Sequence, residues 1–288
     1  MAITVEDMRL LLTNDDGIDA EGLWVMARAV SAWIANAPAG EERSAVICAP
    51  HQNYSGMSAA VGDVYEHPDV PFRTRVIPGA ENIAAYELSA PPALCAIIGG
   101  LGAFGPRPDL VLSGINPGAN VGLSVLHSGT VGAVLTAAQL GISGLAVSVQ
   151  WGREVHFDTA AALAMEVVEE ILSLPSRVTL SLNVPNLTAD AVKGIRRARI
   201  STAEVVAGAQ LTPNEAGDAG TVRLVMGAAS PTIGDVSNEE SGDDGALVES
   251  GYGALTALQG PRDNSDLGLT ALLDAAVTRM SAHLETLR

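Results

Sequence analysis

The chain has 288 residues, of which 48% are apolar and only 3% aromatic, so a large core must be built from alanine, valine, leucine and isoleucine. That composition is typical of a parallel sheet covered by helices. The formal net charge of −17 argues against a nucleic-acid duplex or an anionic membrane as the main partner. A small anionic substrate is not excluded, because a metal ion and helix N-termini can make one pocket locally positive.

Cysteine usage and the lack of a targeting segment favour the cytoplasm. Cys48 and Cys95 lie in apolar segments without metal-ligand spacing, so no disulfide framework is expected. Residues 1–12 lack the basic start and the cleavage site of a secretory signal, and no uncharged apolar run is long enough to span a membrane. We therefore expect a soluble cytoplasmic protein.

Strand-like and helix-like segments alternate up to about residue 185. The helix-like segments carry apolar residues at helical spacing, and the strand-like segments are short apolar runs. The strand-like segments are residues 8–13, 44–49, 109–113, 145–149 and 178–184, and the helix-like segments are residues 20–34, 93–98, 130–140 and 158–172. This alternation predicts an α/β fold with a doubly wound parallel sheet.

The sequence pattern changes after about residue 190. Residues 200–255 combine short β-like runs, such as 221–226, with segments rich in Gly, Asn and Asp, while residues 270–287 have the pattern of an amphipathic helix. The predicted division of the chain is a core over residues 1–199, an extended arm or hairpin over 200–260 and a C-terminal helix over 261–288.

Two adjacent aspartates, Asp15 and Asp16, follow the first strand-like run. The carboxyl edge of an open α/β sheet is where ligands bind. Adjacent like charges repel, so two ionised carboxylates favour a cation between them. Asn-Asp-Asp-Gly is also good turn chemistry, so this segment alone is equally consistent with a turn.

Three further polar segments follow a strand or open a helix, so a parallel sheet would bring them to the same edge. They are residues 51–56, 113–120 and 127–130. Ser55 and Asn116 offer only oxygen ligands, as the two aspartates do, and such ligands suit Mg²⁺ or Mn²⁺. Each segment alone also reads as a turn or a helix cap.

The start of the Ala-rich helix has the features of a phosphate-binding site. Ser128, Gly129 and Thr130 would offer unpaired backbone N–H groups and two hydroxyls to an anion. Asn53 and Asn120 could add further donors.

Taken in order and spacing, these four segments resemble the SurE family of metal-dependent nucleotidases, also described as acid phosphatases. The resemblance covers about residues 8–195. It implies a Rossmann-like three-layer α/β/α sandwich with an extended arm, in dimers or tetramers that exchange the arm and the C-terminal helix. It also implies one divalent cation per subunit, Mg²⁺ or Mn²⁺, held by Asp15, Asp16, Ser55 and Asn116, with a phosphate side formed by Asn53, Asn120, Ser128, Gly129 and Thr130.

The chain departs from the family pattern near the expected site and in the arm. His51-Gln52 stands where the family usually has Asp-Arg, and His127 replaces a common tyrosine. Residues 90–95 lose a polar residue, and residues 201–235 do not align. The metal ligands are intact, so these changes bear on substrate preference and oligomer contacts.

The resulting hypothesis is a phosphomonoesterase acting on nucleoside monophosphates, the nucleotide being bound as a small-molecule substrate. Water would attack the phosphoryl group with metal assistance, and Asp15 or Asp16 would orient or deprotonate that water. Direct attack by an aspartate ranks lower, because both carboxylates serve the metal. His127 could act as general acid, contact the substrate or simply pack.

Two alternatives come from other classes. An NAD-dependent oxidoreductase needs Gly-x-Gly-x-x-Gly in the first strand-to-helix turn, where this chain has residues 14–19, Asn-Asp-Asp-Gly-Ile-Asp. A non-catalytic or altered-specificity nucleotide-binding paralogue is favoured by the divergent arm, whereas the intact set of oxygen ligands argues against it.

Overall fold

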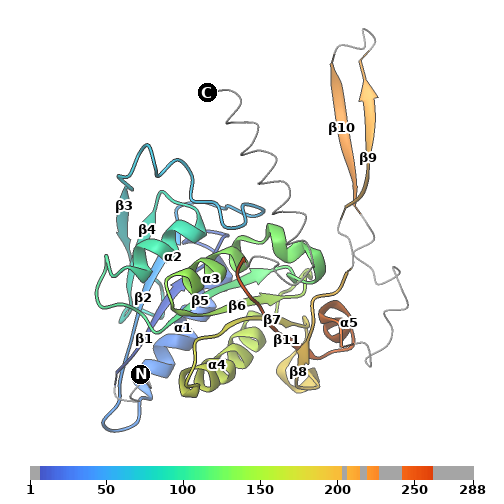
Figure 1. Cartoon of the computed structure of the whole chain (residues 1–288). Coiled ribbons are helices and arrows are strands. Elements are labelled where there is room, and N and C mark those ends of the chain that lie inside the picture. Colours follow the sequence, from blue (N-terminus) through green and yellow to red (C-terminus); the bar gives the residue numbers. More distant parts are fainter. Residues whose placement is uncertain (1–6, 203–205, 215–218, 227–241, 262–288) are drawn as a thin grey trace, which may run out of the picture.

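The structure is a computed structural model that describes residues 7–202, 206–214, 219–226 and 242–261 (Figure 1). Within these residues, nine strands form one sheet: β1 (Asp7–Thr13), β2 (Glu42–Pro50), β3 (Phe72–Arg75), β4 (Ala84–Leu88), β5 (Leu110–Pro117), β6 (Ser143–Val149), β7 (Thr179–Val184), β8 (Ile195–Ala198) and β11 (Gly253–Ala257). The helices are α1 (Glu21–Ala35), α2 (Pro92–Gly100), α3 (Gly129–Gln139), α4 (Phe157–Ser173), α5 (Asp244–Glu249) and the 3₁₀ turns η1 (Gly122–His127) and η2 (Ala189–Ala191). The strands and helices predicted up to residue 185 are all present.

The order of strands in the sheet creates a crevice beside β1. The order is β3-β4-β2-β1-β5-β6-β7-β11-β8, and β4, β2, β1, β5, β6 and β7 are parallel. From β1 the chain first builds outward through β2 and then returns to build the other side through β5. Ligands of doubly wound folds bind at such a reversal, outside the carboxyl ends of the strands.

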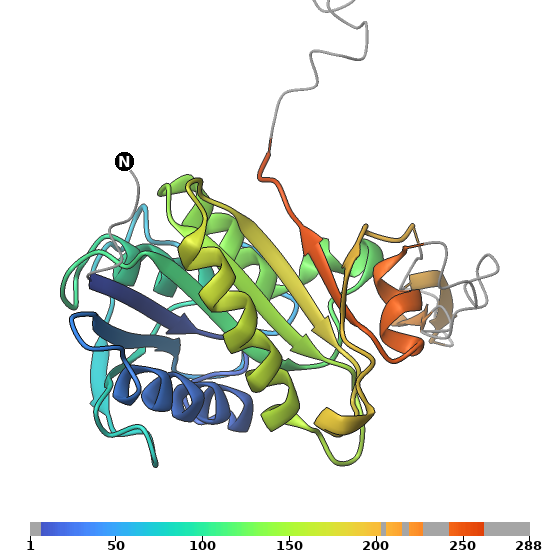
Figure 2. The same ribbon diagram turned by 90° about the horizontal axis from the view of Figure 1, so that it is seen from below.

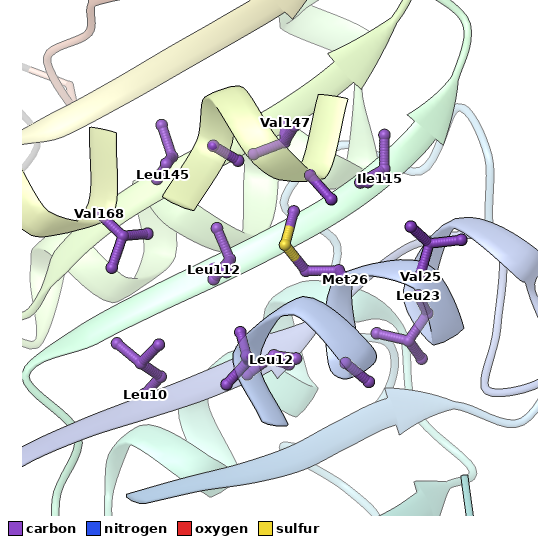
Figure 3. Close-up of a cluster of buried hydrophobic side chains, with 14 of the residues drawn as sticks. Leu10, Leu12, Leu23, Val25, Met26, Leu112, Ile115, Leu145, Val147 and Val168 are labelled. Atoms are coloured by element: carbon purple, nitrogen blue, oxygen red, sulfur yellow. The ribbon is translucent and has the colours of Figure 1, made fainter. Parts of the chain in front are cut away.

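Helices cover both faces of the sheet, which confirms the predicted three-layer sandwich. Helices α1 and α4 lie on one face, and α2 and α3 lie on the other (Figure 2). Successive residues of a strand point to opposite faces. In β1, Leu10 and Leu12 therefore pack under α1 and α4, as Figure 3 shows, whereas Leu11 packs under α2 and α3. The apolar run of β1 is required because both faces of the sheet are buried.

The region after residue 199 does not form a single arm: part of it is a separate hairpin and part of it joins the main sheet. β9 (Val206–Pro213) and β10 (Gly220–Met226) form an antiparallel hairpin that stands away from the main sheet (Figure 1). β11, which the prediction placed in the arm, instead returns to the main sheet between β7 and β8. It escaped prediction because its five residues, Gly253–Ala257, carry little apolar patterning and pair only with strands distant in sequence.

The predicted C-terminal helix, residues 261–288, lies outside the described residues except for residue 261. Among the residues that the structure describes, no helix is both long and apolar enough to cross a membrane.

Candidate metal and phosphate site

The segments singled out in the sequence meet at the reversal of strand order. Asp15 and Asp16 follow the end of β1, and Asn116 lies within the neighbouring β5. β5 runs on to Pro117, beyond its predicted end, and its pairing with β6 is irregular between Ser113 and Asn116. This irregular stretch brings a polar side chain of β5 to the edge where β1 ends.

Asp15 is held by two neighbouring segments. Its backbone oxygen accepts a hydrogen bond of 2.7 Å from the N–H of Tyr54, and its Oδ1 accepts one of 2.6 Å from the hydroxyl of Thr130. The carboxylate lies so close to Gly129 that a Cβ there would come within 2.8 Å of Oδ2. The carboxylate therefore sits against the first turn of α3, where the helix dipole favours a negative charge.

Asp16 and Ser55 are joined by the side chain of Asn53. The Asn53 amide nitrogen donates to Oδ1 of Asp16 at 3.0 Å, and its oxygen accepts from the backbone N–H of Ser55 at 2.7 Å. The other carboxylate oxygen of Asp16, Oδ2, is buried without a hydrogen-bond partner. Burial, followed by the charge of Asp15, raises the pKa of Asp16 from 3.8 to about 6.

The end of β5 and the loop after it are fixed by a local hydrogen bond and by hydrogen bonds to β6 and β7. The amide nitrogen of Asn116 donates to the oxygen of Gly118 at 2.6 Å, so the amide oxygen is the atom that remains for a cation. The Asn120 side chain donates to the hydroxyl of Ser148 at 2.8 Å. The backbone of Asn120 exchanges two hydrogen bonds with the buried side chain of Asn183, at 2.7 and 3.0 Å.

The predicted helix start is confirmed. Ser128 is the N-cap of α3 and its Oγ accepts from the N–H of Val131 at 3.1 Å, as N-cap serines do. The other N–H groups of the first turn, those of Gly129 and Thr130, are suited to an anion, as at helix N-termini in general. Thr130 is fully buried, and its hydroxyl proton is used by Asp15.

One pocket of about 310 Å³ joins most of these groups. Six of the nine predicted site residues line it, while Asn53 and Thr130 bond to its aspartates and Gly129 lies against Asp15. The six are Asp15, Asp16, Ser55, Asn116, Asn120 and Ser128. His127 also lines the pocket with an exposed ring, and so does Ser124, which belongs to no motif and could not have been found from the sequence.

The donor set fits a hard divalent cation. A buried, unpartnered carboxylate oxygen beside a second carboxylate is a costly arrangement unless a positive charge satisfies it. Among the described residues, no group of three or more His, Cys, Asp or Glu side chains could hold a metal. A cation here would therefore rely on two carboxylates supplemented by hydroxyl and amide oxygens, which is chemistry suited to Mg²⁺ or Mn²⁺.

Comparison with known proteins relates the chain to one family. The family model described as Survival protein SurE matches residues 10–206. The chain belongs to the SurE family. The 5'/3'-nucleotidase SurE of Serratia proteamaculans is 34% identical over 254 residues, which are 88% of this chain and 90% of that protein. The 5'-nucleotidase SurE of Syntrophobacter fumaroxidans is 34% identical over 194 residues, or 67% of this chain and 72% of the relative.

A solved SurE structure shares the fold. The crystal structure of the SurE protein from Aquifex aeolicus superposes with a TM-score of 0.71 at 25% identity, covering 93% of this chain and 99% of that one. The Rossmann-like sandwich of this SurE-family member is thus common to both proteins.

The raised pKa of Asp16 predicts a gain in stability when its charge is removed. The pKa of about 6 in the folded protein lies above the ordinary 3.8, so the folded state binds the proton more tightly. In metal-free protein the ionised group therefore lowers stability above pH 6, and this effect fades as the pH falls toward 4. Asp16→Asn should raise the unfolding free energy by about 2 kcal/mol at pH 7.5, and by little at pH 4. Urea unfolding in EDTA measures both, and a difference independent of pH would contradict the prediction.

The bridging role of Asn53 predicts a loss of metal affinity without loss of fold. Asn53→Ala removes the group that ties Asp16 to the Ser55 backbone, and such supporting residues are worth about 10- to 100-fold in metal affinity. Titration calorimetry with Mn²⁺ should show this weakening. The exposed Gln52 beside it makes a matched control, and Gln52→Ala should bind Mn²⁺ like the wild type.

Proposed function

We propose that this protein is a divalent-metal-dependent phosphomonoesterase that hydrolyses nucleoside monophosphates. The observation that carries the proposal is the buried, unpartnered Oδ2 of Asp16, because Asp16 and Asp15 line the same pocket as Ser128, the N-cap of α3. A cation site and an anion site that share one pocket suit a phosphoryl group. The naming of the Serratia and Syntrophobacter relatives as nucleotidases supports a nucleotide as substrate.

The residues divide the work between a cation side and a phosphate side. Asp15, Asp16, Ser55 and Asn116 would hold one Mg²⁺ or Mn²⁺ per subunit. When bound, the cation would offset the negative charge that develops on the phosphoryl oxygens. Ser128 and the N–H groups of Gly129 and Thr130 would bind those oxygens, while Asn53 and Asn120 fix the loops on either side.

Proton transfer would involve groups on both sides of the phosphoryl group. A carboxylate oxygen of Asp15 or Asp16 would orient the attacking water and accept its proton. The ring of His127 lines the pocket and is exposed, so it could deliver a proton to the leaving oxygen or contact the leaving group. Thr130 would act through Asp15, because its hydroxyl donates to that carboxylate.

Metal-dependent phosphate release tests the function directly. Protein stripped with EDTA and assayed with a panel of 5'- and 3'-nucleoside monophosphates should release phosphate only when Mg²⁺ or Mn²⁺ is restored. Asp16→Ala should lower kcat/KM by about 100-fold or more. Asp19→Asn is the control, because the exposed Asp19 pairs with Arg75 outside the pocket. No release with any metal, while Mn²⁺ still binds, would instead identify a non-catalytic paralogue.

The hairpin supports a homodimer or homotetramer. Val222 lies opposite Leu211 in the β9–β10 pairing, and Leu224 follows on the same face, so all three apolar side chains share one side. The exposed fraction is 62% for Val222, 71% for Leu211 and 57% for Leu224. Arg223 opposite Gln210 makes the other side polar. An apolar face that covers no core within the described residues is suited to a second copy.

Substitution on the two faces of the hairpin separates assembly from folding. The double variant Leu211→Glu/Val222→Glu should lower the molecular mass in solution, measured by light scattering. Gln210→Glu/Arg223→Gln, at the directly opposed pair on the polar face, should leave the mass unchanged. A wild-type monomer, or an apolar-face variant of unchanged mass, would contradict the assembly role.

We also place the protein in the cytoplasm. Cys48 and Cys95 are both buried free thiols, which is the usual state of cysteines in a reducing compartment. Burial raises the pKa of Cys48 to about 12 and that of Cys95 well above its ordinary value, so neither is suited to redox chemistry.

A further inference from the structure

Asp244, at the start of α5, is a buried carboxylate that three backbone N–H groups satisfy. Asp244 is only 1% exposed. Oδ1 accepts from the N–H of Ser201 at 3.1 Å and from that of Gly245 at 2.8 Å, while Oδ2 accepts from the N–H of Gly122 at 2.9 Å. Gly122 is 122 residues away in sequence, so this single side chain joins two distant parts of the chain.

The first of these parts is the base of the arm. Ser201 lies where the chain leaves the core toward the hairpin, and Asp244 lies where it returns. Arg199 strengthens this junction: its N–H donates to the oxygen of Gly242, its own oxygen accepts from the N–H of Asp244, and its side chain pairs with Asp243 at 2.7 Å. The outgoing and returning segments of the arm are thus hydrogen-bonded to each other beside the Asp244 carboxylate.

The second part is the segment that leads into the phosphate side of the site. Gly122 begins η1, two residues after Asn120, and η1 ends at His127, next to the Ser128 cap. At its far end η1 is anchored by Ser58, whose hydroxyl donates to the oxygen of Leu126 at 2.7 Å. At its start η1 is held by the bond from Gly122 to Asp244. The preceding residue, Val121, packs against the apolar cluster around α5.

We propose that Asp244 is a positioning residue for the phosphate side of the site, which it links to the base of the arm. The inference rests on the proposed function for its meaning, because the segment it holds lines the proposed substrate pocket. A buried carboxylate is stable only where its donors are in place. The Gly122 N–H must therefore occupy one position, and this fixes where η1 presents Ser124 and His127 to the pocket.

The two oxygens of Asp244 allow a selective test. In Asp244→Asn the amide oxygen can occupy the Oδ1 position and keep the bonds from Ser201 and Gly245. The amide NH₂ then faces the Gly122 N–H, and two donors cannot bond to each other. This variant therefore breaks the link to η1 while leaving the arm base fastened. Asp243→Asn is the matched control, because it makes the same chemical change at the neighbouring carboxylate, which pairs with Arg199 at the arm base.

Four quantities measured on the full-length protein decide the matter. Hydrogen exchange should be faster in Asp244→Asn at the Gly122 amide and unchanged at Ser201. The inhibition constant for inorganic phosphate and the KM for substrate should both rise about tenfold, because η1 then no longer holds the pocket residues in one position. The Mn²⁺ affinity should stay at the wild-type value, because the cation ligands lie on other segments. Asp243→Asn should match the wild type in all of these.

Unchanged Gly122 exchange, or wild-type phosphate inhibition and KM in a folded Asp244→Asn protein, would overturn the inference. So would a parallel loss of Mn²⁺ affinity, which a general loosening of the fold would cause. Should Asp244→Asn fail to fold, Asp244→Ser, whose smaller side chain leaves room for water at Gly122, is measured in its place. For this variant the expected result is weaker phosphate binding with unchanged Mn²⁺ affinity. Exchange at Gly122, phosphate binding by calorimetry and Mn²⁺ affinity need no turnover, so they decide the inference even if the wild type proves inactive as a phosphatase.

Discussion

The repulsion between Asp15 and Asp16 is the constraint on which the site depends. Strand order reverses beside β1, so the turn after this strand opens into the crevice where β5 also ends. Two carboxylates in this crevice cannot both be ionised and buried unless other groups stabilise their charges. The unpartnered Oδ2 and the raised pKa of Asp16 show that the protein alone provides only part of this stabilisation. We infer that a bound cation provides the remaining stabilisation.

The surrounding structure holds this unfavourable pair in place. Thr130 and the first turn of α3 support Asp15, whereas Asn53 joins Asp16 to the Ser55 loop. A larger residue does not fit at position 129, because its Cβ would collide with the Asp15 side chain. In the proposed function, the same helix start that steadies Asp15 would also offer its N–H groups to a phosphoryl group. Under this proposal, the metal-free protein is less stable because its pocket is built for a cation and an anion together.

Much of this arrangement could be predicted from residues alone, because local signals and topology agree. The apolar run of β1 and the stripes of α1 and α4 report burial on a regular period, and parallel strands must bring their ends to one edge. Ser128 was recognisable as a helix cap from its position. What sequence could not supply are contacts between distant segments: the return of β11 to the main sheet, Ser124 in the pocket, and the Asp244 bond to Gly122.

The central claim is that this pocket binds one divalent cation between the two aspartates. Anomalous X-ray diffraction at the manganese edge, from crystals grown with Mn²⁺, tests it most directly. We expect one strong peak per subunit, within coordination distance of Asp15, Asp16, Ser55 and Asn116. An absent peak at saturating Mn²⁺, or a peak that excludes both aspartates, would contradict it.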